Sequence, residues 1–177
     1  MPRRPVDQLN AGERFYSREF PELDVGHFGA LWHLFKVGHL VTTDLDRVAR
    51  RLGHSFADFD LLGTLAIEEN SGMRATDLAL TLCISDAVVS ERVARLEQEG
   101  LLSRRRSEAD KRAYDLILTP RGRDLVVEAI ALITGEAHIA RFFRRMTAED
   151  RATLLRLLAL LHQLYDREFP GAASRGD

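Results

Sequence analysis

The sequence predicts a mainly α-helical fold that is interrupted once, near the middle of the chain, by a β-hairpin. Apolar residues recur at helical spacing in long segments toward both ends of the chain. Between these segments, one short stretch alternates apolar and polar residues, as a half-buried strand does. A length of 177 residues, with 45% hydrophobic and 29% charged residues, suits one globular domain with appended helices.

The N-terminal third of the chain predicts a long helix preceded by a short one. Residues 1–11 contain two prolines and few apolar side chains, which indicates a loose arm. Residues 12–20 can form a short helix that ends before Pro21, because proline disfavours helical geometry in the residue before it. From His27 onward we expect a long amphipathic helix that stops at Gly53. Its apolar face contains Phe28, Leu31, Phe35, Leu45, Val48 and Leu52.

Two shorter helices are expected next. Ser55 is placed to cap a helix over residues 55–70, because a serine hydroxyl can accept a hydrogen bond from a free N–H group of the first turn. That helix ends near Gly72, and a second short helix covers residues 74–82.

A tight connection then leads into a further helix over residues 85–99. Ser85 is its expected cap and Gly100 its expected stop. Cys83, in the connection, lies between two large apolar residues, which indicates a buried side chain. The residues that we expect to face inward are Ala79, Val89, Val93 and Leu96.

The hairpin follows directly. One strand starts at Leu101, a second runs through the alternating segment from Tyr114 to Leu118, and a polar tip over residues 107–111 joins them.

The C-terminal third returns to helix. Thr119 and Pro120 mark the start of a long helix, with threonine as cap and proline in the first turn. Thr147 marks the start of a last helix. The apolar side of the first contains Leu125, Ile130 and Ile133, and that of the last contains Leu154, Leu157, Leu158, Leu161, Leu164 and Tyr165.

Two short helices followed by a hairpin have the order of a winged helix-turn-helix, whose second helix enters the major groove of DNA with its N-terminal residues. The start of the helix over residues 85–99 has small and hydroxyl side chains that allow close approach to base edges. The predicted DNA contacts on this helix are Ser85, Asp86, Ala87, Val89, Ser90 and Arg95.

The local charge supports the same interpretation. The whole chain has a formal net charge of −2. The segment from Arg92 to Arg112 contains seven basic and four acidic residues, so it is a positively charged segment in a slightly acidic protein. A local basic surface binds phosphates in a salt-dependent way. The predicted contacts on the hairpin are Arg106, Asp110, Lys111 and Arg112.

The stretch from Leu78 to Arg123 resembles the MarR family of transcriptional regulators. The residues that carry the resemblance are Leu78-Ala79, Ser90, Arg92, Leu96-Glu97, Gly100-Leu101, Asp110-Lys111-Arg112, Leu118-Thr119 and Gly122. The resemblance implies a homodimer built from the N- and C-terminal helices, which binds a palindromic site on double-stranded DNA. It also implies that Arg112 enters the minor groove and that Asp110 orients it.

The resemblance divides the chain into three parts. Residues 1–54 form an N-terminal arm, an extra helix and a dimerisation helix. Residues 55–119 form the winged helix-turn-helix domain, and residues 120–177 form C-terminal dimerisation helices.

The stretches Pro21–Val25 and Phe59–Leu62 further resemble the urate-responsive subgroup of the family. That resemblance implies a repressor that a small anionic effector releases, either urate or another purine-pathway or aromatic anion. Carried over, the ligand-binding residues are Asp60, Arg92, Arg104 and Tyr16. Tyr16 stands where the subgroup has tryptophan, so the identity of the ligand stays open. Asp60 and Arg92 could instead form an ion pair that only holds the DNA-binding helix.

Two other classes of protein are compatible with the sequence. A ligand-blind architectural DNA-binding protein and a helical protein-interaction module both stay open as alternatives. We expect no enzyme, because the sequence has no phosphate-binding glycine loop, nucleophile elbow or paired catalytic carboxylates. We also expect no metal site, no cofactor and no membrane association. The default location is the cytoplasm, and a redox role for Cys83 stays open.

Overall fold

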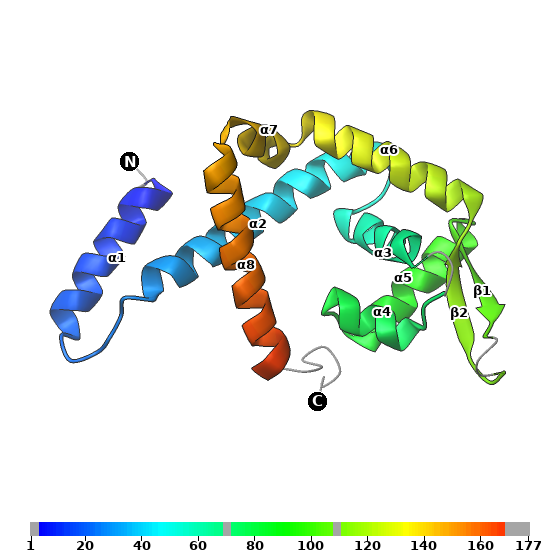
Figure 1. Ribbon diagram of the computed structural model, residues 1–177, viewed down its shortest axis with the longest axis horizontal. Coiled ribbons are helices and arrows are strands. Elements are labelled where there is room, and N and C mark those ends of the chain that lie inside the picture. Colours follow the sequence, from blue (N-terminus) through cyan, green and yellow to red (C-terminus); the bar gives the residue numbers. More distant parts are fainter. Residues whose placement is uncertain (1–3, 69–71, 108–110, 169–177) are drawn as a thin grey trace. The chain divides into compact units, whose positions relative to one another are not determined.

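The computed structural model describes residues 4–68, 72–107 and 111–168 of the chain. Within these residues the fold is mainly helical, with one two-stranded antiparallel sheet (Figure 1). The chain divides into two compact units, Met1–Asp44 and Leu45–Asp177. The sequence-based division into three parts stays a prediction.

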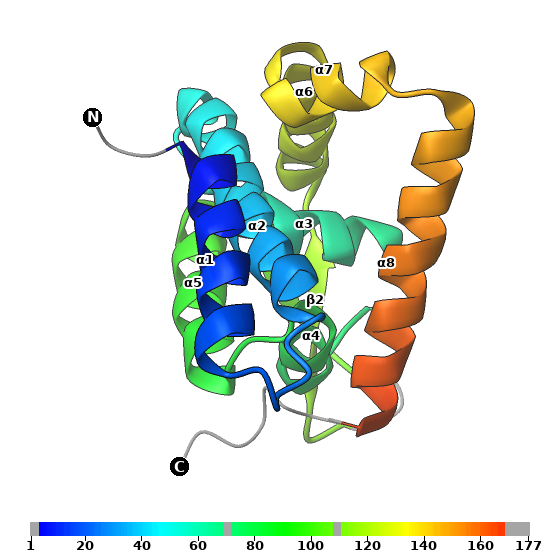
Figure 2. The same ribbon diagram turned by 90° about the vertical axis from the view of Figure 1, so that its left-hand side faces the viewer.

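The N-terminal unit contains α1 (Pro5–Glu19) and most of α2 (Phe28–Ala49). The start of α1 corrects the expectation of a loose arm over residues 1–11, because the helix begins at Pro5. Proline is tolerated in the first turn of a helix, where its missing N–H group would have no partner. A loop joins the two helices, and α1 lies in front of α2 in Figure 2.

The second unit begins within α2 and turns a corner at Gly53. A short 3-10 helix, η1 (Arg50–Leu52), extends α2, and Gly53 then adopts a left-handed conformation with φ of 82°. Ser55 caps α3 (Phe56–Ile67) in a reciprocal capping box with Asp58, as predicted. The Oδ1 atom of Asp46 also accepts a hydrogen bond from the N–H of Phe56 at 2.7 Å, so side chains from both sides fix the corner.

The core of the second unit lies between α3, α4 (Ala75–Leu82), α5 (Asp86–Gln98) and the hairpin (Figure 1). The four side chains predicted to face inward are all buried. The largest side chains in this core that are fully buried are Leu61, Leu62, Leu78, Val89, Val93, Leu96, Leu101 and Leu102. This apolar contact fixes the position of α5, the helix predicted to bind DNA.

The hairpin pairs β1 (Leu102–Arg106) with β2 (Tyr114–Leu118), with Leu102 opposite Leu118. Met73 adds an isolated antiparallel bridge to Leu116. The first turn of the next helix packs closely against the base of the hairpin at Gly122, where a Cβ atom would lie 2.0 Å from the carbonyl oxygen of Leu101. Only glycine permits this approach.

The C-terminal third contains α6 (Pro120–Glu136), α7 (His138–Arg145) and α8 (Ala148–Glu168). Thr119 caps α6 as predicted. The sequence did not predict the break at Ala137, where the backbone becomes extended and α7 begins. Ile130, on the expected apolar side of α6, is 60% exposed in the single chain.

Candidate nucleic-acid interface

The turn between α4 and α5 is set by its backbone conformation. Cys83 adopts the left-handed region with φ of 52° and ends α4. The side chain of Ser85 then accepts a hydrogen bond from the N–H of Val88 at 3.4 Å and caps α5. The thiol of Cys83 is exposed, which corrects the expectation of a buried side chain. The left-handed turn at this position explains why a residue between two apolar neighbours faces solvent.

The two faces of α5 differ in burial. Val89 is 0% exposed and packs in the core with Val93 and Leu96. This corrects the prediction of Val89 as a DNA contact, because a side chain within the core cannot reach a base edge. Its role is to hold the helix against the rest of the unit.

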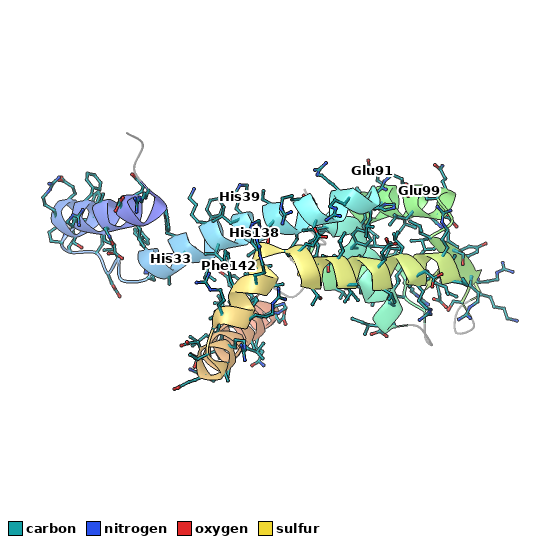
Figure 3. The ribbon with its side chains drawn as sticks, turned by 90° about the horizontal axis from the view of Figure 1, so that it is seen from above. His33, His39, Glu91, Glu99, His138 and Phe142 are labelled. Atoms are coloured by element: carbon teal, nitrogen blue, oxygen red, sulfur yellow. The ribbon has the colours of Figure 1, made fainter. Side chains whose placement is uncertain are left out.

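The opposite face of α5 presents three of the predicted contacts to solvent, Asp86, Ala87 and Ser90. Glu91 is exposed beside them, and sequence reasoning did not include it (Figure 3). Glu91 lies two positions from each of the buried residues Val89 and Val93. On a helix, that spacing places its side chain on the opposite side, which faces solvent. This face therefore combines two carboxylates with small and hydroxyl side chains.

Arg95 is placed differently from the other predicted contacts. Its guanidinium forms a short ion pair with the carboxylate of Asp58, which is only 4% exposed. It also donates a hydrogen bond to Glu99 at 3.1 Å. Arg95 therefore connects α5 to the start of α3.

Asp58 remains charged at this position despite its surroundings. Burial alone would raise its pKa, but hydrogen bonds from Ser55 and the positive charge of Arg95 outweigh it and hold the pKa of Asp58 below its usual value.

Further contacts join α5 to the same corner and to α6. The Oε2 atom of Glu99 lies 3.6 Å from the Nδ1 atom of His54. Arg121 of α6 donates a hydrogen bond to the carbonyl oxygen of Glu99 at 2.8 Å. The C-terminal end of α5 is thus held by groups from the corner and α6, while its N-terminal face is exposed.

The hairpin presents a run of cations. Arg104, Arg105 and Arg106 are consecutive and exposed on β1. Arg104 donates a hydrogen bond to Glu97 of α5 at 3.0 Å. Lys111 and Arg112 are exposed beyond the tip, and Asp110 lies outside the described residues.

The predicted ligand-binding residues are brought together only in part. Partial burial raises the pKa of Asp60, and the nearby positive charge of Arg92 opposes this shift. These two residues are therefore electrostatic neighbours, on α3 and α5. Tyr16 lies on α1, in the other compact unit.

Two further findings concern metal-type clusters and long apolar helices among the described residues. Among them, no three His, Cys, Asp or Glu side chains form a group that could hold a metal ion. In the same part of the chain, no helix has the length and apolar character needed to cross a membrane.

Comparisons with known proteins agree with this geometry. Residues 59–114 match the sequence profile of the MarR family. The chain is 29% identical over 146 residues to the HTH-type transcriptional regulator PecS of Dickeya dadantii, which covers 81% of this chain and 85% of that protein. It is 27% identical over 128 residues to the HTH-type transcriptional repressor Rv2887 of Mycobacterium tuberculosis, which covers 72% of this chain and 89% of that protein.

A solved structure shows a similar fold. Sco3205 is a MarR family transcriptional regulator from Streptomyces coelicolor, and its structure was determined in complex with DNA. It superposes with a TM-score of 0.67 at 25% identity and covers 80% of this chain and 92% of that one.

Proposed function

We propose that the chain binds a palindromic operator as a homodimer and represses transcription until a small molecule releases it, a role that its match to the MarR family over residues 59–114 and its similarity to PecS and Sco3205 support. The chain is a regulator and not an enzyme. The repressor role is supported by the similarity to Rv2887, which is named a repressor.

One observation carries the DNA-binding part of the proposal. The side of α5 that contains Val89, Val93 and Leu96 is buried in the core, whereas the opposite side is exposed at the N-terminal end of the helix. The neighbouring strand β1 has three consecutive exposed arginines. A rigid helix with a free polar face can read base edges, and neighbouring arginines can neutralise phosphates. In this proposal, α5 contacts the bases and the arginines of β1 contact the phosphates.

The exposed carboxylates on α5 give this surface a preference among DNA sequences. Asp86 and Glu91 repel phosphates, so they add little to affinity. Each can accept a hydrogen bond from the amino group of cytosine in the major groove. We assign them to sequence discrimination, and we assign Arg105, Arg106 and Lys111 to phosphate contact. Arg112 is assigned to the minor groove, with Asp110 as its partner.

The dimer is proposed from the exposed apolar helices. Large apolar side chains are exposed along α2 and α8, including Phe35 at 68% and Leu155 at 71%. Apolar surface of this extent marks an interaction site. A second copy of the chain is the partner that a palindromic operator requires.

Ligand release is proposed from Asp60 and Arg92. The positive charge of Arg92 lowers the pKa of Asp60, against the effect of burial. An anion that draws Arg92 away would remove this positive charge from Asp60. Because Arg92 lies on α5, such a change acts on the DNA-binding helix itself. Urate is the first compound to test, and Arg104 is the second candidate cation.

The proposal is tested by fluorescence anisotropy on DNA from upstream of the protein's own gene, at several salt concentrations. Arg112→Ala should weaken binding and reduce the slope of log affinity against log salt by about two, because the proposed homodimer loses one positive charge near the DNA from each of its two protomers. Arg18→Ala, on α1 and paired with Glu19, is the matched control and should leave the slope unchanged. An unchanged slope for Arg112→Ala would remove this residue from the interface.

A further inference from the structure

The N-terminal unit contains a cavity that the proposed DNA contacts do not use. It lies between α1 and the first half of α2 and has a volume of about 950 Å³. That volume is at the upper end of the range of about 300 to 1,000 Å³ that small-molecule sites occupy. All the residues that line it fall between Gln8 and Phe35, so the cavity belongs to one compact unit.

Aromatic rings form much of the wall. Tyr16, Phe28 and Trp32 all line the cavity. The Tyr16 ring lies edge-on to that of Phe28, with centroids 5.3 Å apart, and stacks on that of Phe20 at 6.3 Å. These contacts fix the ring of Tyr16 from two sides. The faces of such rings attract cations through their quadrupoles.

A carboxylate is placed in the same wall by a glycine. A Cβ atom on Gly29 would lie 2.9 Å from Oε1 of Glu13, so any larger residue would push this carboxylate away from α2. Glu13, Asp24 and Gly29 all line the cavity. Oδ1 of Asp24 accepts a hydrogen bond from the N–H of Gly26 at 3.0 Å, which holds the second carboxylate in the loop between the helices.

The charges of the lining have one sign. Its carboxylates belong to Glu13 and Asp24, and none of the lining residues is Lys, Arg or His. The cation of Lys36 lies outside the lining, with its Nζ atom 5.3 Å from the centroid of the Phe35 ring, and the His27 ring lies edge-on to that of Phe28. An anion that enters this cavity would meet two carboxylates and no cation.

We propose that this cavity binds an aromatic amine cation, with its ring among Tyr16, Phe28 and Trp32 and its ammonium group toward Glu13 and Asp24. The chemistry is opposite in sign to the urate-like anion that the resemblance at Tyr16 implies. Any release of DNA by such a cation rests on the proposed function, whereas occupation of the cavity does not.

Trp32 gives a direct test, because it is the one tryptophan of the chain and lines the cavity. Its emission is followed during titration with benzyltrimethylammonium, with phenylacetate as an anion of similar size and with urate. We expect a saturable change with the cation at concentrations where the two anions have no effect. Glu13→Gln should weaken the cation by about two- to fivefold, the range of a partly exposed charge interaction. Glu22→Gln, in the same loop region but outside the lining, should not.

Two outcomes would overturn the proposal. The first is tighter binding of phenylacetate or urate than of the cation. The second is no saturable change with the cation, together with a Trp32 emission that shifts on dilution of the protein, which would mean that a second copy fills the cavity. Operator binding measured in parallel separates this site from the proposed function, because the Trp32 titration does not depend on DNA.

Discussion

At the scale of single residues, two aspartates on α3 have opposite electrostatic roles although they are two positions apart. The pKa of Asp58 is lowered, because its hydrogen bonds from Ser55 and the charge of Arg95 outweigh its burial. The pKa of Asp60 is raised by burial, against the charge of Arg92. The first carboxylate therefore stabilises the fold, and the second is tolerated at a cost that is consistent with a role in function.

These directions predict how two variants depend on pH. Asp58→Asn should lower the free energy of unfolding at neutral pH by about 1 to 3 kcal/mol, because charged hydrogen bonds are lost. The stability from Asp58 is present above its unfolded pKa of about 3.9 and is lost as the pH falls through its folded pKa, so the defect should shrink in acid. Urea unfolding at fixed protein concentration measures both quantities.

Asp60→Asn is the matched comparison and should change stability at neutral pH by no more than about 0.5 kcal/mol, in the stabilising direction. Its gain should vanish as the pH falls below the unfolded pKa, since a raised folded pKa opposes only the charged form. The same direction and pH dependence for both variants would contradict this account.

At the scale of elements, α5 is a helix that is fixed at its C-terminal end and exposed at its N-terminal end. Arg95 is the main polar connection of this helix to α3, through Asp58. Arg95→Ala should therefore weaken operator binding by disturbing the position of α5, without reducing the salt slope as Arg112→Ala does. The anisotropy titrations at several salt concentrations distinguish the two. A slope reduced by about two, one for each protomer of the proposed dimer, would show that Arg95 contacts phosphate instead.

Most helix boundaries could be predicted from local signals. Capping residues such as Ser55 and Thr119 mark the starts of their helices, because their hydroxyl groups accept hydrogen bonds from nearby backbone N–H groups. The break at Ala137 has no such signal, because no capping side chain precedes α7. The start of α1 at Pro5 was missed because proline marks both loops and first turns of helices.

The site was predictable in outline but not in detail. The motif order located α5 and the hairpin, whereas the division between contact and support depended on the core. The apolar spacing of α5 already indicated that Val89 faces inward, whereas Arg95 turns toward an aspartate 37 positions away. Such long-range partners leave no trace in the local pattern. The cavity at Tyr16 likewise depends on how α1 meets α2.

At the scale of the whole molecule, binding to a palindromic operator requires two copies of the chain. The second unit has its own core, but the apolar faces of α2 and α8 have large exposed side chains. A homodimer that covers these faces would present two copies of α5 to a palindromic site, with half-sites about one helical turn of DNA apart. Protein association and DNA recognition are thus one proposal, and they are testable together.

The most direct test of the central claim is the ratio of affinities for the upstream operator and for a scrambled duplex of equal length, at physiological salt. We expect one dimer per operator and a preference for the operator of about a thousandfold or more, as sequence-specific regulators have. Equal affinity for both duplexes would contradict it and favour a ligand-blind architectural protein. No binding to either duplex would favour a helical protein-interaction module.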